Sequence, residues 1–155
     1  MKAEETIDYH IRCAWNLIAK HYNTKAAEYG ATMASGYVLL YIDKYEGTPS
    51  TKLGPLMGME PRSMVRTLDL LEQRGLIYRE KSKRDKRVVL IKLTPDGLDK
   101  RQLAKQSVIG LNQLLMNQIS SKKLQVFFEV MEEITDILKD DNSYKTINLN
   151  HEKKH

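Results

Sequence analysis

The chain has 155 residues, a formal net charge of +5 and a sequence pI near 9.2, with 41% hydrophobic and 29% charged residues. This length fits one globular domain with a real core, and no run of about 18 apolar residues is present that could span a membrane. A single cysteine, Cys13, excludes an intrachain disulfide.

The first residues lead into a polar helical pattern without the apolar stretch of a secretory signal, so we expect the protein in the cytoplasm. A helix is predicted from about Thr6 to Glu28, and Gly30 suits its end. The apolar residues that recur there at helical spacing are Ile7, Ile11, Trp15 and Ile18.

A second helix is predicted from about Met33 to Tyr45. It is apolar over more than half of its circumference, so we expect it at the centre of the core. The segment 46–49, Glu-Gly-Thr-Pro, ends this helix. Ser50 or Thr51 then caps a short third helix that ends at Gly58.

A fourth helix is predicted from Pro61, which suits a first helical position, to the basic turn at Arg74 before Gly75. A helical wheel assigns two faces to it. The buried face comprises Met64, Val65, Leu68 and Leu71, and the opposite face comprises Arg62, Ser63, Arg66, Thr67 and Leu70. Arginine and hydroxyl side chains are the types that contact DNA bases and phosphates, although an isolated face of this kind is more often simply solvated.

Two strands are predicted next, over residues 76–78 and 88–93, and they flank a strongly basic segment. Residues 79–87 read Arg-Glu-Lys-Ser-Lys-Arg-Asp-Lys-Arg and carry +4 of the net charge of +5. A basic hairpin tip beside an arginine-bearing helix is typical of a duplex-DNA reader. The alternative is that the tip serves solubility or protects an edge strand.

Within this tip, Asp85 lies two residues before Arg87, close enough to orient its guanidinium group. An oriented arginine suits a narrow minor groove, where the negative potential is enhanced. The predicted DNA-contacting residues of the tip are Lys83, Arg84, Asp85, Lys86 and Arg87.

Two further helices are predicted after the hairpin. The first opens at Thr94-Pro95-Asp96 and runs to about Asn117, and the second is capped by Ser120 or Ser121 and runs through Leu138. Both carry apolar stripes that a winged-helix module of about 65 residues is too small to cover, so a partner surface is expected. Residues 140–155 read as a polar C-terminal tail.

Residues 50–97 resemble the winged helix-turn-helix of the MarR (multiple antibiotic resistance regulator) family. Three segments carry the resemblance: Thr67-Leu68-Asp69-Leu70-Leu71-Glu72-Gln73-Arg74-Gly75-Leu76-Ile77, Asp85-Lys86-Arg87, and Leu93-Thr94-Pro95-Asp96-Gly97. Glu60 departs from the pattern, because relatives often have Ser, Thr or Asp at that N-cap position.

The resemblance implies a mainly α fold with a small β-hairpin, in which a winged helix-turn-helix is joined to flanking helices that form a dimerisation domain. Residues 1–155 would be a single MarR-like domain. Residues 33–93 would bind DNA, residues 1–32 and 94–139 would form the dimerisation region, and residues 140–155 would be the tail. The resemblance also implies a homodimer on a pseudo-palindromic operator in double-stranded DNA. Most relatives are repressors that a small lipophilic or phenolic effector releases.

In such a dimer, the fourth helix would enter the major groove and Arg87 the flanking minor groove. Effector-lining candidates are the aromatic residues of the first two helices, which suit an apolar ligand with one polar handle: Tyr9, His10, Trp15, Tyr37 and Tyr41. Each is at least as readily an ordinary core or interface residue.

Two other chemistries are weighed and set aside. Some relatives sense hydroperoxides through a cysteine of the first helix, but their pattern would place it near Asp8 rather than Cys13, and a lone helical cysteine is usually a small buried hydrophobe. The histidines show no metal-binding spacing, except for His151 and His155 if the tail were helical. We therefore predict no metal and no cofactor.

Three functions compete at this stage. The leading one is a dimeric DNA-binding regulator, and the second is a winged-helix adaptor that binds proteins. An adaptor would tend to carry apolar residues where Arg62 and Arg66 stand. An enzyme finds no support, because no phosphate-binding loop, metal cluster or nucleophile motif is present.

Overall fold

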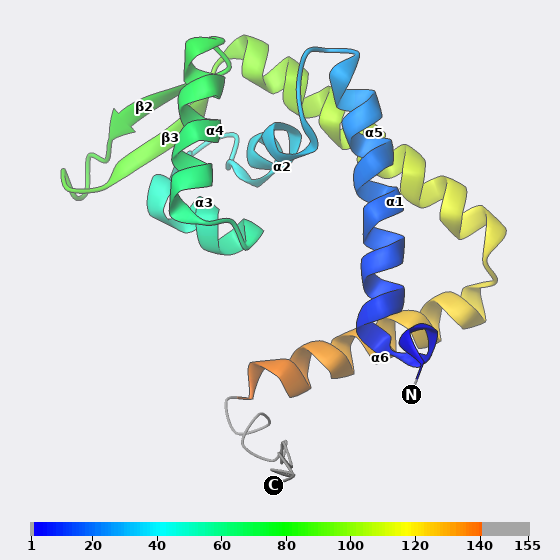
Figure 1. The fold of residues 1–155 in the computed structure, drawn as a ribbon. Helices are drawn as coiled ribbons and strands as arrows, with labels where there is room; N and C mark the ends of the chain where they lie inside the picture. Colours follow the sequence, from blue (N-terminus) through cyan, green and yellow to red (C-terminus); the bar gives the residue numbers. More distant parts are fainter. Residues whose placement is uncertain (1, 141–155) are drawn as a thin grey trace, which may run out of the picture. The chain divides into compact units, whose positions relative to one another are not determined.

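The computed structural model describes residues 2–140, so the predicted tail from residue 141 onward lies outside the described residues. The chain divides into two compact units, residues 1–110 and 111–155. Figure 1 shows a hairpin that projects at one side of the first unit, with helices making up the rest of it. After a short 3-10 helix (Ala3–Glu5), the elements are α1 (Ile7–Ala27), α2 (Met33–Tyr41), β1 (Thr48–Pro49), α3 (Ser50–Met57), α4 (Pro61–Gln73), β2 (Ile77–Lys81), β3 (Val89–Leu93), α5 (Pro95–Gln118) and α6 (Ser121–Lys139).

The predicted fold class, mainly α with a small β-hairpin, is confirmed. No helix among residues 2–140 has the length and apolar character needed to cross a membrane. The α4 helix begins at Pro61 and ends just before Gly75, whose φ of +68° is a conformation that glycine adopts most readily.

The sheet has one more strand than the sequence predicted. Its order is β1-β3-β2, and all neighbours are antiparallel. We expected residues 46–49 only to break the preceding helix, but Thr48 pairs with Ile91 and Pro49 with Leu90. Two residues are too short to show the alternation that reveals a strand. The hairpin therefore shares a sheet with the segment that leads into α3.

The α2 helix ends at Tyr41, so its predicted end at Tyr45 is wrong. Ile42 is extended, with φ −73° and ψ 124°. The Asp43 carboxylate then accepts hydrogen bonds from the backbone N–H groups of Tyr45 (2.8 Å) and Glu46 (2.7 Å). An aspartate that bonds the following amides stabilises a turn in competition with the helix.

The predicted side-chain cap of α3 is also wrong. Pro49 occupies the N-cap position and no side chain caps the helix, because β1 leads directly into it and makes Ser50 the first helical residue. Pro55 lies inside this helix. At α6, Ser120 is the N-cap residue, but its side chain makes no capping bond.

The core lies where α2, α3, α4 and the sheet meet. Its buried residues are Val38, Leu39, Ile42, Leu53, Met64, Leu68, Leu71, Ile77 and Ile91. The central position predicted for the second helix is thereby confirmed. Val65 is the exception to the predicted buried face of α4, because 54% of it is exposed. It lies about 100° around the helix from the buried Met64, at the edge of the apolar stripe.

The end of α4 is fastened to the start of α5. The Thr94 hydroxyl donates to the Gly75 carbonyl (2.6 Å), and the Thr94 N–H donates to the Leu76 carbonyl (3.1 Å). Gly97 approaches Leu76 so closely that a Cβ atom on it would lie 1.9 Å from that carbonyl oxygen. The hairpin, α4 and α5 are thus joined at one point.

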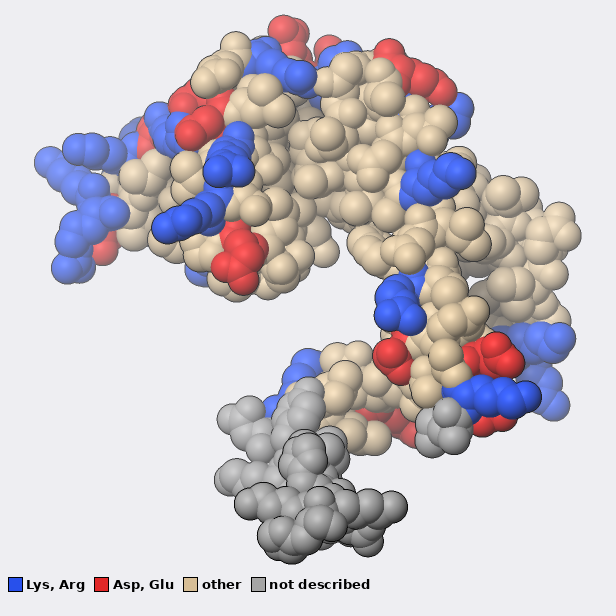
Figure 2. All heavy atoms as spheres, viewed as in Figure 1, with Lys and Arg blue, Asp and Glu red and all other residues tan. Residues whose placement is uncertain are grey.

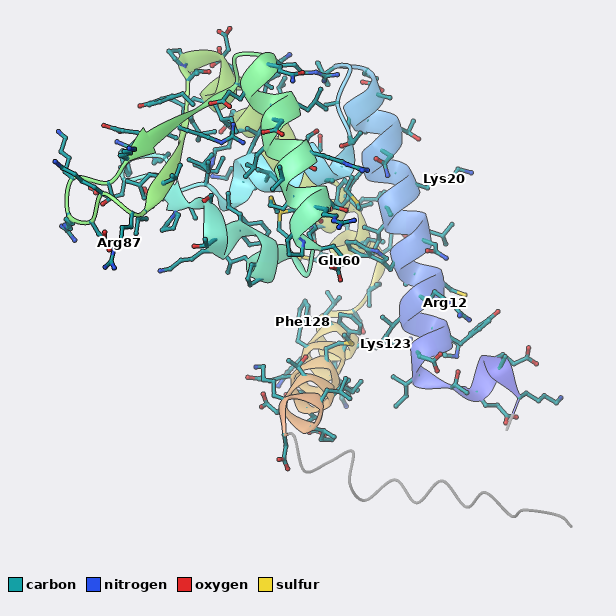
Figure 3. All side chains as sticks on the ribbon, turned by 60° about the vertical axis from the view of Figure 1, so that its left-hand side comes forward. Arg12, Lys20, Glu60, Arg87, Lys123 and Phe128 are labelled. Carbon is teal, nitrogen blue, oxygen red and sulfur yellow. The ribbon has the colours of Figure 1, made fainter. Side chains whose placement is uncertain are left out.

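The second unit contains the end of α5 and the whole of α6. No residue of α6 is buried, although this helix is rich in large apolar side chains. The exposed ones are Val126, Phe127, Phe128, Val130, Ile137 and Leu138. Figure 3 shows Phe128 projecting from the helix.

Candidate nucleic-acid interface

The outer face of α4 carries the residues predicted to contact DNA. Arg62, Ser63 and Arg66 are exposed, whereas Thr67 is half-buried and its hydroxyl donates to the Ser63 carbonyl (2.9 Å). That bond is local to the helix, and it leaves the hydroxyl oxygen as an acceptor. Glu60, labelled in Figure 3, is the exposed N-cap residue of this helix, and its side chain makes no capping bond.

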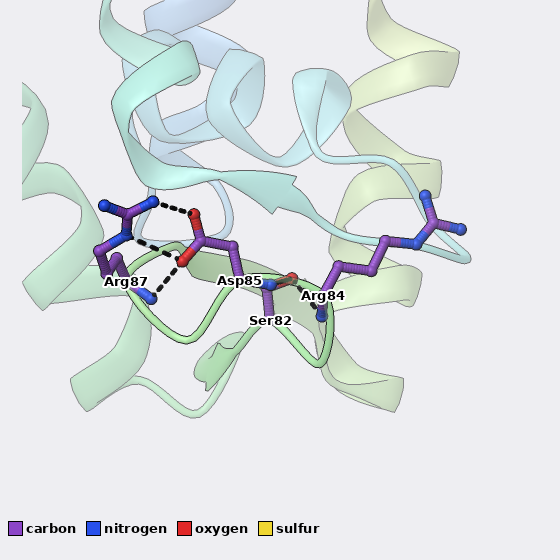
Figure 4. A network of polar contacts seen from close by, with 4 residues as sticks. All are labelled: Ser82, Arg84, Asp85 and Arg87. Carbon is purple, nitrogen blue, oxygen red and sulfur yellow. Dashed lines mark hydrogen bonds and ion pairs between the residues drawn. The ribbon is translucent and has the colours of Figure 1, made fainter.

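The hairpin between β2 and β3 is the predicted wing, and its tip is an ordered turn. The Ser82 N–H donates to the Val88 carbonyl, and the Val88 N–H donates to the Asp85 carbonyl, each at 2.9 Å. The Ser82 hydroxyl oxygen accepts from the N–H groups of Arg84 (3.2 Å) and Asp85 (3.4 Å). These bonds fix the backbone that presents the basic side chains (Figure 4).

Asp85 holds Arg87, as the spacing of the two residues predicted. The two carboxylate oxygens accept from Nε and Nη2 of Arg87, each at 3.2 Å, and Oδ1 also accepts from the Arg87 N–H at 3.0 Å. The hydrogen bonds from the Arg87 side chain and N–H lower the pKa of the Asp85 carboxyl. The Arg87 side chain is 91% exposed and points away from the body of the unit (Figure 3).

The wing and α4 face the same way. In Figure 2 the Lys and Arg atoms gather at the hairpin tip on the left, and more of them lie over α4 beside it. Besides Arg87, the tip carries Lys83, Arg84 and Lys86, all within two residues of Asp85. A positive hairpin beside an arginine-bearing helix has the charge distribution of a surface that binds a polyanion.

Part of the basic run does not contribute to this surface. Arg79 Nη2 lies 2.7 Å from Asp69 Oδ1, and Nη1 contacts the Glu72 carboxylate, so this arginine ties β2 to α4. The sequence pattern predicts for Arg79 only a contribution to the positive charge of the segment 79–87. The available signal was the acidic pair three residues apart on α4, which places both carboxylates on one helix face.

The first unit also contains a cavity of about 230 Å³, bounded by α1, α2, the end of α4 and the N-terminal part of α5. Of the five predicted effector-lining residues, Tyr37 lines it, whereas Tyr9, His10, Trp15 and Tyr41 are not among its lining residues. Tyr9, His10 and Trp15 lie about two turns or more before Tyr22, the first residue of α1 that lines the cavity, and Tyr41 is the last residue of α2.

Tyr22 is a cavity residue that the effector prediction omitted. Its ring packs edge-on against that of Tyr37, with centroids 5.9 Å apart. Burial raises the pKa of both phenols. Tyr22 continues the apolar stripe of α1, which was the available signal for a role in packing or lining.

Cys13 is exposed, so the expectation of a buried small hydrophobe is wrong. The rest of α1 is similar, because Tyr22 is the buried residue of this helix. No group of three His, Cys, Asp or Glu side chains suited to a metal occurs in the described part of the chain. The pair His151 and His155 lies outside it.

Comparison with known proteins gives one consistent result. Residues 31–89 match the model of the MarR family. The chain is 29% identical over 97 residues to the organic hydroperoxide resistance transcriptional regulator of Bacillus subtilis (strain 168). The matched region covers 63% of this chain and 66% of that protein, just under two thirds of its length.

Two solved structures share the fold over most of the chain. CouR from Rhodococcus jostii RHA1, bound to p-coumaroyl-CoA, superimposes with a TM-score of 0.77 at 23% identity and covers 86% of this chain and 94% of its own. MepR of S. aureus, in a complex with DNA, superimposes with a TM-score of 0.77 at 20% identity, and the match covers 84% of this chain and 97% of MepR. These findings show a MarR-family match over residues 31–89 and, over most of the chain, the fold of the two solved structures.

Proposed function

We propose that this protein is a homodimeric regulator that binds a pseudo-palindromic operator in double-stranded DNA and acts as a repressor that a small-molecule effector releases. The observation that carries the proposal is the arginine that a carboxylate holds at the wing tip, on the same side as the exposed arginines of α4. MepR, which has the same fold, is known in a DNA complex. The matches to a transcriptional-regulator family model and to a transcriptional regulator agree with the prediction that the chain is not an enzyme.

In the proposed complex, the first turns of α4 enter the major groove. There Arg62 and Arg66 reach guanine edges or phosphates, and Ser63 and Thr67 contact phosphates or base edges. The wing follows the backbone into the flanking minor groove. Because Asp85 already orients Arg87, less side-chain entropy is lost when the guanidinium enters that groove.

The proposal is tested by fluorescence anisotropy with a duplex from the intergenic DNA upstream of the protein's own gene. A scrambled duplex of equal length serves as the reference, and both are titrated over a salt series. Wild type is compared with Arg66→Ala and Arg87→Ala. The matched control is Arg12→Ala, which removes an exposed arginine of α1 that lies outside the proposed interface.

We expect tight, sequence-selective binding by wild type and by Arg12→Ala. Each of the other two variants should bind more weakly, with the salt slope reduced by about one where a phosphate contact is lost. Equal and weak binding of both duplexes, indifferent to Arg66 and Arg87, would refute the proposal. The protein-binding adaptor would then be the better hypothesis.

The homodimer is proposed because the exposed apolar side chains of α6 would be buried against a second subunit. Exposed apolar residues of this number are uncommon on a monomer and are typical of an interface. A second copy is the occupant that a two-fold operator requires, since each subunit then reads one half-site.

The effector site is proposed at the cavity of the first unit. It is mostly apolar and includes Tyr22 and Tyr37, as suits a small ligand with an apolar body. The end of α4 forms part of its wall through Leu71 and Arg74, so a ligand there would touch the helix that reads DNA.

A further inference from the structure

One apolar side chain lies exposed near the N-terminal end of the helix that we propose reads DNA. Val65 belongs to the second turn of α4, and 54% of it is exposed. The other apolar residues of the predicted buried face, Met64, Leu68 and Leu71, are all buried. The structure therefore identifies Val65 as a surface residue, which the sequence pattern does not.

The position of Val65 on α4 is defined by the residues that follow it on the same side. It precedes Asp69 by four residues and Glu72 by seven, and side chains at these spacings lie on one side of a helix. Asp69 and Glu72 hold Arg79 of β2. Val65 thus lies on the side of α4 that faces the hairpin, nearer to the N-terminal end of the helix than these ion pairs.

The immediate neighbours of Val65 are cationic. Arg62 lies three residues before it and Arg66 follows it directly, and both are exposed. Residues three apart are neighbours on the surface of a helix. An exposed valine alone is ordinary on a protein surface. This one lies beside arginines of the type that bind phosphates and guanine edges, which distinguishes it.

Valine is also an unfavourable residue for an exposed position in a helix. Its branched Cβ restricts the side chain there, so it is a weaker helix former than alanine, leucine or most charged residues. The core gives little in return, because more than half of Val65 stays exposed. Departures from such local rules are expected at functional sites.

We propose that Val65 contacts the C5-methyl group of a thymine in the major groove, so that each half-site of the operator carries a thymine on the hairpin side of α4. The major groove displays this methyl group, and an apolar side chain recognises thymine by it. The first turns of a recognition helix are those that reach base edges. The inference rests on the proposed function, because it names one base of the proposed operator and the residue that reads it.

Leu70 is the competing residue, because it is the other apolar side chain on α4 that is exposed, by 39%. It lies five residues after Val65 and about 140° around the helix from it. Leu70 is therefore turned away from the hairpin side and lies further from the end of α4 that enters the groove. Leu70→Ala is accordingly a matched control, since it shortens an exposed apolar side chain of the same helix.

The contact is tested with two duplexes that differ only in the methyl groups of their thymines. One is the intergenic duplex of the operator titration. The other has every thymine replaced by deoxyuridine, which pairs in the same way and lacks the methyl group. Anisotropy titrations compare wild type with Val65→Ala, Val65→Ile and Leu70→Ala, all in the full-length protein. Deoxyuridine also alters DNA shape, but this effect is common to the four proteins, so differences between them isolate the contact.

Wild type should bind the deoxyuridine duplex more weakly, by about fourfold for each methyl group that the complex buries. Val65→Ala should bind the two duplexes within about twofold of each other. Val65→Ile and Leu70→Ala should keep the wild-type ratio, because both retain a branched apolar side chain at position 65. Neither Val65 nor Leu70 belongs to the core cluster, so these replacements leave the core intact.

The same ratio in wild type and Val65→Ala would overturn the assignment, and so would a loss of the ratio in Leu70→Ala alone. A methyl group carries no charge, so Val65→Ala should keep the wild-type salt slope. A reduced slope would mean that the replacement acts through phosphate contacts, and it would also overturn the assignment.

Replacement of one thymine at a time then locates the contact. The loss of affinity should be concentrated at one thymine in each half-site, toward the flanking minor groove that Arg87 is proposed to enter. A loss spread evenly over all thymines would contradict a contact with one residue. If wild type selects the intergenic duplex over the scrambled one but ignores the methyl groups, the Val65 contact is wrong and the proposed function stands. If wild type does not distinguish these two duplexes, the proposed function itself fails.

Discussion

Arg79 and Arg66 are both arginines beside the proposed DNA surface, but their surroundings give them different tasks. Arg79 is engaged by Asp69 and Glu72 of α4, so it sets the position of β2 against that helix. Arg66 is exposed on the outer face of α4. We class Arg79 as a positioning residue, because its charge is already balanced by two carboxylates.

Replacement of Arg79 by glutamine should therefore weaken operator binding without changing its salt dependence. The loss arises because the wing is no longer held at its angle to α4, while the number of phosphates neutralised is unchanged. Anisotropy titrations over a salt series check this, with Arg66→Ala as the comparison whose slope should fall by about one. A lower slope in Arg79→Gln would mean that Arg79 contacts phosphate instead.

The Asp85 carboxyl should titrate below its ordinary pKa of 3.8, because the Arg87 side chain and then the Arg87 N–H bond its charged form. A lowered folded-state pKa means that the interaction is fully present above pH 3.8 and is lost as pH falls through the lower value. Carbon-detected NMR of the carboxyl should show this, and in Arg87→Ala the midpoint should move back toward 3.8. Orientation of Arg87 is therefore independent of pH in the neutral range.

Among the elements, long periodic segments could be predicted from sequence and short ones could not. The apolar spacing of residues 7–18 and the proline and glycine at the ends of α4 were sufficient to place these helices. Strand β1 was not predicted, because two residues are too few to show an alternating pattern. The end of α2 was not predicted, because it depends on the hydrogen bonds that the Asp43 side chain makes in the turn. At the interface, the contact between Asp85 and Arg87 could be predicted because the two residues are close in sequence. The contacts of Arg79 could not, because they depend on how β2 packs against α4.

At the junction of α4 and α5, Gly97→Ala should destabilise the first unit by about 1–3 kcal/mol or more, because its Cβ would lie 1.9 Å from the Leu76 carbonyl oxygen, a backbone atom. Gly110→Ala is the matched control on the same helix. Nothing lies within 4 Å of its added Cβ, so it should stabilise by about 0.5–1 kcal/mol through helix propensity. Urea denaturation followed by circular dichroism measures both, and equal stabilities of the two variants would contradict the close approach.

At the scale of the whole molecule, the exposed apolar residues of α6 determine the assembly that we propose. Light scattering after size exclusion should give twice the chain mass of 17.9 kDa at micromolar concentration. The unfolding temperature of the proposed dimer should rise with protein concentration, since association stabilises the folded state by mass action.

Phe128→Glu should shift the protein toward the monomer, because it places a charge on the apolar face of α6. Ser121→Glu introduces the same carboxylate at the start of that helix, where acidic side chains are favourable, and should leave the dimer intact. Both are checked by the same light-scattering measurement. A wild-type monomer at micromolar concentration would refute the homodimer.

The wing is built in two sections, and this has a consequence for how target preference can change. Its base is locked into the core, where Ile77 and Ile91 are 2% and 0% exposed and β1 pairs with β3. No residue of the tip, 82–88, belongs to the core cluster. The tip can therefore change without a change in the core. A tip of another length or charge would alter the proposed DNA contacts and so the preferred operator, while the packing at the base of the hairpin stays the same.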